Sequence, residues 1–295
     1  MTIKVENNRP KSTNSKGFVT LHSNGKKRVL DKPLLMGIVN VSPDSFYSKS
    51  SPKNNAEMLQ LIDLHIQNGA AIIDLGAVST KPQAKMVSAE EEWRRLLPAL
   101  KLARATFPQM FISVDTTRSE IAAAAAESGA DMINDISGGS FDPQMFEIMG
   151  RLSIPFILSH ILGKPSNMQA HPQYKNVTKE VYRFLKRQSA SALRLGVRQI
   201  IVDPGFGFGK TLQHNYEILA GLKSFKKLGF PVLVGLSRKS MIYNALHTTP
   251  EKALNATTAA HTIALMQGVD ILRVHDVKEA AEAIEIVKHL RSASV

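Results

Sequence analysis

The sequence contains no cysteine among its 295 residues. Without thiols the chain cannot form disulfides or thiolate metal sites. It also lacks any apolar run near the roughly 18 residues that a membrane-spanning helix needs, and its first residues contain no apolar core of the kind found in signal peptides. We therefore expect a cytoplasmic protein with no membrane partner.

Aromatic residues are scarce, and the abundant positive charge is not clustered. Phe, Trp and Tyr make up 6% of the chain, the formal net charge is +12, and the longest basic run is Gly25-Lys26-Lys27-Arg28. Nucleic-acid surfaces usually combine a continuous basic patch with aromatic rings on which bases stack. We therefore expect no nucleic-acid partner, and an anionic small substrate or a merely basic surface explains the charge better.

The remaining composition is that of an ordinary globular protein. Hydrophobic residues make up 43% of the chain and charged residues 21%, and a chain of this length can form one large barrel domain. Residues 1–17 are polar and without pattern, so we expect a loose tail there and one domain over 18–295. Asn24-Gly25, flanked by short apolar segments, predicts a β-hairpin with a type I′ turn.

Beyond the hairpin, short apolar segments alternate with longer amphipathic ones. The predicted strands cover residues 34–39, 71–75, 111–114, 132–133, 156–158, 200–202, 232–236 and 271–274. The predicted helices cover about 55–68, 88–106, 118–128, 142–152, 176–195, 212–228, 239–267 with a break, and 278–291. Two have capping-box signatures, Ser88 with Glu91 and Thr117 with Glu120. Eight β and α units predict an α/β fold, a (β/α)8 TIM barrel in a single domain. The competing doubly wound sheet would need a G-x-G-x-x-G turn after an early strand, and the sequence has none.

The most informative segment is 199–215, in which an apolar run ends at Asp203-Pro204 and glycines alternate up to Gly209. This pattern predicts a buried strand that presents an acid, two aromatic rings and a cation at its carboxyl end. Gly209-Lys210-Thr211 resembles the end of a phosphate-binding loop, but the first glycine of that motif would fall on Pro204. We therefore interpret the segment as a ligand site and not as a nucleoside triphosphate site.

Every predicted strand ends in a side chain that could hold a ligand. These side chains are Asn40, Asp74, Asp115, Asn134, His160, Asp203, Ser237 with Arg238 and Lys239, and Arg273 with His275. A single Asn or Asp at a strand end is more often a cap or a turn former than a ligand. In a barrel, however, all strand ends converge on the face that carries catalysis, so the whole set predicts a substrate site. His160, His171 and His214 are interpreted as structural.

Several long motifs, in order, resemble those of the dihydropteroate synthase family. They are Met-Gly-Ile-Val-Asn-Val-Ser-Pro-Asp-Ser-Phe (36–46), Ser-Thr-Lys-Pro (79–82), Ser-Val-Asp-Thr (113–116), Ile-Asn-Asp-Ile-Ser-Gly-Gly (133–139), Asp-Pro-Gly-Phe-Gly-Phe-Gly-Lys-Thr (203–211), Gly-Leu-Ser-Arg-Lys-Ser-Met-Ile (235–242) and Leu-Arg-Val-His-Asp-Val (272–277). The resemblance covers nearly all of residues 33–290. It implies a transferase on a (β/α)8 barrel that joins 6-hydroxymethyl-7,8-dihydropterin diphosphate to p-aminobenzoate and releases pyrophosphate with Mg²⁺.

The resemblance also implies roles for individual residues. Pterin binding is expected from Asp115, Asn134, Asp203 and Lys239. Diphosphate binding is expected from Asn40, Arg273 and His275, with Asn40 on the Mg²⁺ side. Aminobenzoate binding is expected from Thr80, Lys81, Pro82, Phe208 and Ser237. The catalytic residues are then Asp115, Lys239, Arg273 and His275, with Asp115 stabilising the positive charge that develops on the pterin.

Two loops depart from the family pattern. Residues 47–50 read Tyr-Ser-Lys-Ser where the family usually has an acidic, glycine-rich turn, which predicts a more basic and less flexible lid. Residues 76–83 read Gly-Ala-Val-Ser-Thr-Lys-Pro-Gln against a common Gly-Gly-Glu-Ser-Thr-Arg-Pro-Gly. Because Lys81 cannot reproduce the two-pronged contact of arginine, this loop and its response to sulfonamide-like analogues are expected to differ.

Two other functions compatible with the motifs stay open. One is a methyltransferase that acts on methyltetrahydrofolate on the same barrel, which would not need Ser-Arg-Lys-Ser or the pair of Arg273 and His275. The other is a non-catalytic paralogue that binds a pterin without transferring it. Barrels of this family are usually dimers, so a homodimer is expected, and apolar residues Ala280, Ala283, Ile284 and Val287 fit either a dimer interface or packing on the barrel.

Overall fold

The fold was analysed in a computed structural model that describes residues 18–41, 51–78 and 87–293. The strands are β1 (Thr20–Ser23), β2 (Lys26–Val29), β3 (Leu34–Asn40), β4 (Ile72–Gly76), β5 (Phe111–Asp115), β6 (Met132–Asp135), β7 (Phe156–Ser159), β8 (Ile200–Asp203), β9 (Leu233–Val234) and β10 (Ile271–Val274). The predicted 1–17 tail and the predicted contacts of Thr80, Lys81 and Pro82 lie outside the described residues.

Strands β3 to β10 form one parallel barrel, which confirms the predicted fold. The eight-stranded sheet has the order β8-β7-β6-β5-β4-β3-β10-β9. It closes where Val202 of β8 forms a parallel bridge with Val232, just before β9. The Val202 amide donates to the Pro231 carbonyl at 2.9 Å. Each predicted strand is present, and closure removes the exposed sheet edges that an open sheet would leave.

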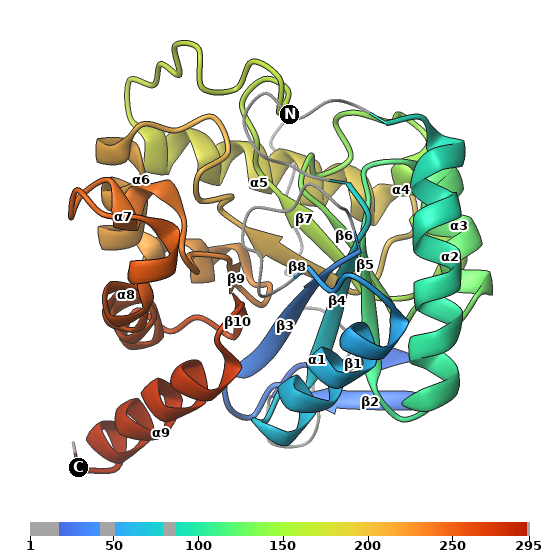
Figure 1. The fold of residues 1–295 in the computed structure, drawn as a ribbon. Coiled ribbons are helices and arrows are strands. Elements are labelled where there is room, and N and C mark those ends of the chain that lie inside the picture. Colours follow the sequence, from blue (N-terminus) through green and yellow to red (C-terminus); the bar gives the residue numbers. More distant parts are fainter. Residues whose placement is uncertain (1–17, 42–50, 79–86, 294–295) are drawn as a thin grey trace, which may run out of the picture.

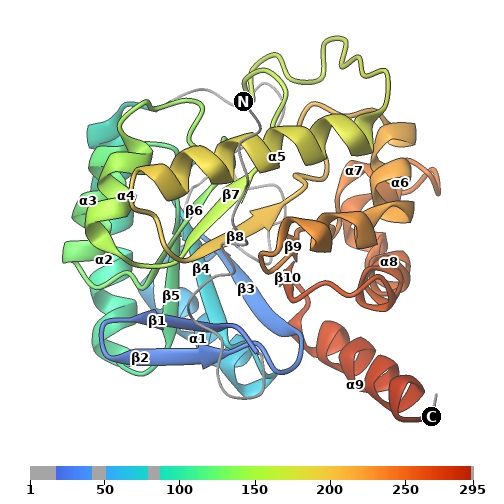
Figure 2. The same ribbon diagram turned by 180° about the vertical axis from the view of Figure 1, so that it is seen from behind.

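Helices follow the strands and surround the barrel, as Figures 1 and 2 show from opposite sides. They are α1 (Asn55–Gln67), α2 (Ala89–Thr106), α3 (Ser119–Glu127), α4 (Met145–Leu152), α5 (Val177–Arg194), α6 (Leu212–Ala220), α7 (Ser240–Tyr243), α8 (Leu254–Met266) and α9 (Val277–Ala293), with 3-10 turns η2 (Leu222–Leu228) and η3 (Pro250–Lys252). None of the helices in the described ranges combines the length and hydropathy that a bilayer crossing requires.

The two predicted helix caps have different outcomes. Ser88 caps α2 as predicted, since its hydroxyl accepts from the Glu91 amide. The predicted box at Thr117 is wrong, because α3 begins after Arg118 and has no side-chain cap from its own segment. A carboxylate from the next βα loop takes that role, with Asp142 Oδ2 accepting from the Ser119 amide at 2.7 Å. Such a long-range cap carries no signal in local sequence spacing.

The N-terminal hairpin closes one end of the barrel. Its turn residues Asn24 and Gly25 both have positive φ, as a type I′ turn requires, and β1 and β2 lie across the lower end of the barrel in Figure 1. Leu21 and Leu30 of the hairpin pack on a layer of inward-facing strand residues. Lys26 Nζ forms an ion pair with the buried Asp131 at 2.7 Å. The hairpin therefore seals the apolar end of the barrel interior.

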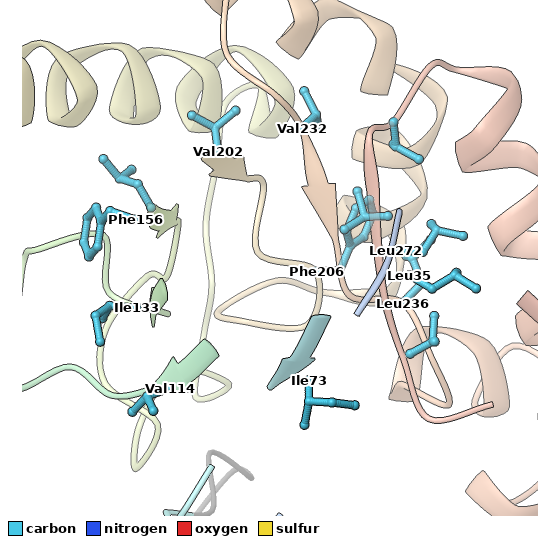
Figure 3. Packing of buried hydrophobic residues seen from close by; sticks show 14 of the residues in the cluster. Leu35, Ile73, Val114, Ile133, Phe156, Val202, Phe206, Val232, Leu236 and Leu272 are labelled. Atoms are coloured by element: carbon cyan, nitrogen blue, oxygen red, sulfur yellow. The ribbon is translucent and has the colours of Figure 1, made fainter. Parts of the chain in front are cut away.

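A second, larger core lies between the strands and the helices. Figure 3 shows Ile73, Val114, Ile133, Phe156 and Val202 on the outer side of their strands. All five side chains are fully buried. Because side chains alternate across a strand, the neighbouring residues of these strands face the barrel interior, where the polar groups are found.

Candidate active site

The inward-facing side chains of the barrel change from apolar to polar over two residues along each strand. Inward-facing Ile72, Met132, Ile201 and Ile271 belong to the apolar layer sealed by the hairpin. Two residues further along each strand, on the same inward side, lie Asp74, Asn134, Asp203 and Arg273. The strand pattern therefore brings these four predicted strand-end side chains into one chamber at the carboxyl ends of the strands.

An arginine from the last strand is shared by two carboxylates. Arg273 Nε donates to Asp74 Oδ2 at 2.6 Å, and its Nη2 donates to Asp115 Oδ2 at 3.1 Å. Asp74 Oδ2 also accepts from Asn134 Nδ2 at 3.1 Å. These contacts join β4, β5, β6 and β10 into one polar network. Asp74 had been predicted only as a strand-end residue without a role, although an acid within Ile-Ile-Asp-Leu-Gly is a signal for a buried polar group.

The Asp115 carboxylate has an unusual acidity. Burial raises the pKa of Asp115 to about 7, with Arg273 opposing that rise and Asp74 adding to it.

The backbone of Gly76 separates the Asp115 side chain from Asn40. A Cβ at Gly76 would lie 3.3 Å from Asn40 Oδ1 and 3.6 Å from Asp115 Cβ, so glycine leaves room between the two functional groups.

The Asp203 carboxylate is fixed from two sides. Its Oδ1 accepts from the Gly205 amide at 2.8 Å, and its Oδ2 accepts from Ser159 Oγ at 3.2 Å. Gly205 has a φ of +70°, and a Cβ there would lie 1.9 Å from the His160 carbonyl oxygen. This turn therefore requires glycine, which explains one member of the alternating pattern in 203–209.

Lys239 faces the same loop from the opposite side. Its Nζ donates to the Phe206 carbonyl at 2.5 Å and lies 4.5 Å from the centre of the Phe208 ring. Burial lowers the pKa of Lys239 to about 8, while Asp203 acts in the opposite direction. Lys239 therefore remains a cation at neutral pH, held between a carbonyl and a ring face.

The structure separates Lys239 from two basic residues that look similar in the sequence. Lys210 Nζ is buried and contacts His160 Nδ1 at 2.9 Å, the Gly205 carbonyl at 2.7 Å and the Phe208 carbonyl at 3.0 Å. Burial and Lys210 lower the pKa of His160, which leaves its ring neutral. Lys210 thus organises the loop from within, and His160 is structural as predicted.

Arg238 also has a structural role. It forms two hydrogen bonds to the carboxylate of Asp276, at 2.8 and 2.9 Å, and donates to the carbonyls of Pro250 and Glu251. Its φ is +53°, an uncommon value for a residue with a side chain. The contacts with Asp276 tie the loop after β9 to the loop after β10, and so set the position of the adjacent Lys239.

Ser237 and His275 form a pair between the same two loops. Ser237 Oγ accepts from the His275 amide at 3.2 Å and lies 2.9 Å from His275 Nδ1. Burial, with Arg273 and Arg238 next in effect, lowers the pKa of His275 well below its usual value. The imidazole is therefore neutral at pH 7 and can serve as a hydrogen-bond donor.

The aminobenzoate-side predictions are only partly within the described residues. Phe208 is half-buried and packs with Ile136, Ile161 and Met168, so one face belongs to a small apolar cluster while the ring also meets Lys239. Ser237, expected on the aminobenzoate side, lies next to His275, and its Oγ accepts from the His275 amide. His214 takes part in the cap of α6 with Thr211, in agreement with its predicted structural role.

Known proteins of one family resemble this chain over most of its length. A sequence model of the family described as "Pterin binding enzyme" matches residues 36–275. The chain is 41% identical to a dihydropteroate synthase of Escherichia coli strain K12 over 275 residues, which are 92% of this chain and 97% of that protein. It is 38% identical to a dihydropteroate synthase of Haemophilus influenzae, over 90% of this chain and 97% of that protein.

Solved structures give the same result. A Yersinia pestis dihydropteroate synthase in a sulfonamide drug complex superimposes with a TM-score of 0.89 at 38% identity, covering 93% of this chain and all of that one. A Thermus thermophilus dihydropteroate synthase in complex with 4-aminobenzoate gives a TM-score of 0.81 at 38% identity, covering 92% and 99%. The chain therefore belongs to the dihydropteroate synthase family of pterin-binding enzymes.

Proposed function

We propose that the chain condenses 6-hydroxymethyl-7,8-dihydropterin diphosphate with p-aminobenzoate to 7,8-dihydropteroate and pyrophosphate. The observation that carries the proposal is the network in which Arg273 joins Asp74 and Asp115 at the mouth of the barrel. A reaction that separates a pterin cation from a diphosphate anion needs opposite charges fixed close together. This network supplies both signs on rigid strands.

The pterin ring would lie among Asp115, Asn134, Asp203 and Lys239. A pterin presents a fixed row of donors and acceptors, which carboxylates, an amide and an ammonium can match. The Asp203 carboxylate is already held by Gly205 and Ser159, so it does not have to reorganise when the ligand binds. Lys239 would supply a donor to the acceptor side of the ring.

The chemical step would be mainly electrostatic. As the bond to the diphosphate breaks, positive charge develops on the pterin, and the Asp115 carboxylate is the anion placed to stabilise it. The aminobenzoate amine is already a nucleophile and needs positioning more than deprotonation. The bond that forms joins this nitrogen to the pterin methylene carbon, the carbon–oxygen bond to the diphosphate breaks, and the amine loses a proton to solvent.

The leaving group would be bound by Arg273, His275 and Asn40. In the described part of the chain, the Arg273 guanidinium donates through Nε and Nη2, so the Nη1 edge can face a phosphate. The neutral His275 imidazole adds a donor without adding charge.

The donor set fits a magnesium ion that is held mainly by the substrate. No group of three or more His, Asp or Glu in the described ranges could hold a metal by itself. Mg²⁺ commonly keeps several waters and uses one or two protein oxygens together with substrate phosphates, which the Asn40 amide oxygen could provide. When bound, Mg²⁺ would neutralise charge on the diphosphate.

We also propose that the chain is a cytoplasmic homodimer. Ala280, Ala283 and Val287 of α9 are buried within the subunit, so they do not form the interface. The exposed large apolar residues of α8 and α9 are Ile263, Met266, Ile286 and Leu290. Burial of these side chains against a second copy would remove apolar surface from water. Sedimentation of the wild type and of an Ile286→Lys, Leu290→Lys variant tests this, since only the wild type should sediment as a dimer.

Pyrophosphate release by the purified protein tests the proposed reaction. The protein is incubated with the dihydropterin diphosphate and Mg²⁺, with and without p-aminobenzoate. Release that depends on aminobenzoate is the expected result, and a sulfonamide should compete with the aminobenzoate. Pterin binding without such release would favour the non-catalytic alternative, and transfer of a methyl group from methyltetrahydrofolate would favour the methyltransferase. Glu147→Gln, in an exposed ion pair with Arg151, serves as a control for charge removal.

A further inference from the structure

One buried carboxylate connects the two halves of the proposed substrate site. Asp74 is fully buried, and its Oδ2 accepts from both Arg273 Nε at 2.6 Å and Asn134 Nδ2 at 3.1 Å. Under the proposed function, Arg273 binds the diphosphate and Asn134 binds the pterin ring. A single oxygen atom therefore holds a residue from each end of the same substrate.

The strand order explains this central position. Five neighbouring strands follow in the order β6-β5-β4-β3-β10, with Asp74 on the middle strand. Asn134 comes from β6 and Arg273 from β10, so each partner reaches inward from two strands away, on opposite sides. All three side chains follow inward-facing apolar residues by two positions, which directs them to the same point in the chamber.

The hydrogen bonding of Asp74 argues against a purely structural role. Its second oxygen, Oδ1, is buried and has no hydrogen-bond partner in the described part of the chain. An unsatisfied carboxylate oxygen is unfavourable, and buried ion pairs are often replaceable by apolar residues without loss of stability. A residue kept for stability alone would not need a charge at this place.

We propose that Asp74 is a positioning residue that aligns the pterin-binding and diphosphate-binding ends of the site at once. This inference rests on the proposed function. By accepting from Nε, Asp74 turns the Nη1 edge of Arg273 toward the diphosphate. By accepting from Nδ2, it fixes the orientation of the Asn134 amide, whose oxygen is then presented to ring donors. Without Asp74, the carboxylate partner left to Arg273 among the described residues is Asp115, whose negative charge is needed by the developing cation.

The test measures the two ends separately, with fragments that do not react. Affinities for 6-hydroxymethyl-7,8-dihydropterin and for inorganic pyrophosphate with Mg²⁺ are determined by calorimetry for the wild type and Asp74→Asn. We expect both affinities to fall about tenfold or more, because hydrogen bonds to charged groups are lost or misaligned. Asn134→Ala should weaken mainly the pterin, and Arg273→Lys mainly pyrophosphate.

The matched control is Ser113→Ala. Ser113 lies directly opposite Asp74 in the strand register, is fully buried and also has a hydroxyl without a partner in the described residues. The substitution Ser113→Ala removes a polar group from the same layer as Asp74. The affinities for the dihydropterin and for pyrophosphate should both stay within about twofold of the wild type, since a lone hydroxyl without partners contributes little. A similar loss in Ser113→Ala would mean that any disturbance of the layer has this effect, and would overturn the proposal.

The proposal requires that Asp74→Asn loses affinity for the dihydropterin and for pyrophosphate together. If folded Asp74→Asn keeps either affinity within about twofold of the wild type, the coupling does not exist. If that variant does not fold, Asp74→Glu keeps the charge but displaces it by one methylene, and wild-type affinities there would also overturn the proposal. Fragment binding needs no turnover. If the wild type binds both fragments but shows no aminobenzoate-dependent pyrophosphate release, the proposed function is contradicted. The fragment affinities of the Asp74 variants would still test the role of Asp74.

Discussion

Replacing Asp115 by Asn should lower turnover and raise stability, two effects that rarely go together. The substitution keeps the shape of the side chain and removes one negative charge. A unit charge about 5 Å from the developing cation, at an effective dielectric constant of about 20, is worth about 3 kcal/mol. The turnover number for pyrophosphate release should therefore fall about a hundredfold.

The stability effect follows from the acidity of Asp115. Its pKa is about 7 in the folded protein against 3.8 for an isolated aspartate side chain in water, so the folded state binds this proton more tightly than the unfolded state. The contribution of Asp115 to the free energy of unfolding is therefore largest below pH about 4, falls as pH rises to about 7, and stays low above it. Asparagine has no such loss, and Asp115→Asn should be more stable at pH 8 by on the order of 2 kcal/mol.

Two measurements test the expected effects of Asp115→Asn on stability and turnover. Urea denaturation at pH 8 and pH 5 should show that the gain in stability of Asp115→Asn shrinks at the lower pH. The acid limb of kcat/KM in the wild type should fall below pH about 7 and should be absent in the variant. Turnover close to the wild-type value would remove Asp115 from the chemical step. A parallel loss of turnover and stability would show that the carboxylate is structural.

Three further substitutions test the basic residues. Burial lowers the pKa of Lys239 to about 8, so pterin affinity should fall as pH rises through about 8, and Lys239→Met should bind weakly and without this pH dependence in a fluorescence titration. Lys210→Met removes the ammonium donor to the Gly205 and Phe208 carbonyls and should lower the free energy of unfolding by about 3 kcal/mol in urea. Arg238→Lys loses the two-pronged contact with Asp276 and should cost about 3 kcal/mol in thermal denaturation, with a severalfold lower rate of pyrophosphate release; an unchanged melting temperature would contradict this.

The fold was predictable because its signals are local and repeated. Each apolar strand segment is short, each is followed by an amphipathic segment, and each of the eight predicted strands overlaps a strand of the barrel. The hairpin turn is equally local, since Asn24 and Gly25 are residues that tolerate positive φ. The cap of α3 was missed because its acceptor, Asp142, comes from another unit of the barrel.

The roles of the basic residues were less accessible. Lys210, Arg238 and Lys239 all lie in motifs after strands, and sequence position alone assigns each of them to the chamber. The hydrogen-bond partners show that two of them have structural roles, since Lys210 binds the carbonyls of its own loop and Arg238 binds Asp276. The distinction depends on which acceptors are buried nearby, and that information appears only when the loops are placed side by side.

The polar chamber shows why a barrel can separate stability from chemistry. Along β4, Ile72 packs in the layer closed by the hairpin, and two residues later Asp74 is a buried charge. Apolar packing at the closed end holds the strands in register, so the carboxyl ends can tolerate charges that would be costly elsewhere. Those charges are then arranged by contacts that span several strands, as Asp74 does between Asn134 and Arg273. Strand periodicity places each group in the chamber, but only closure of the barrel decides which groups meet.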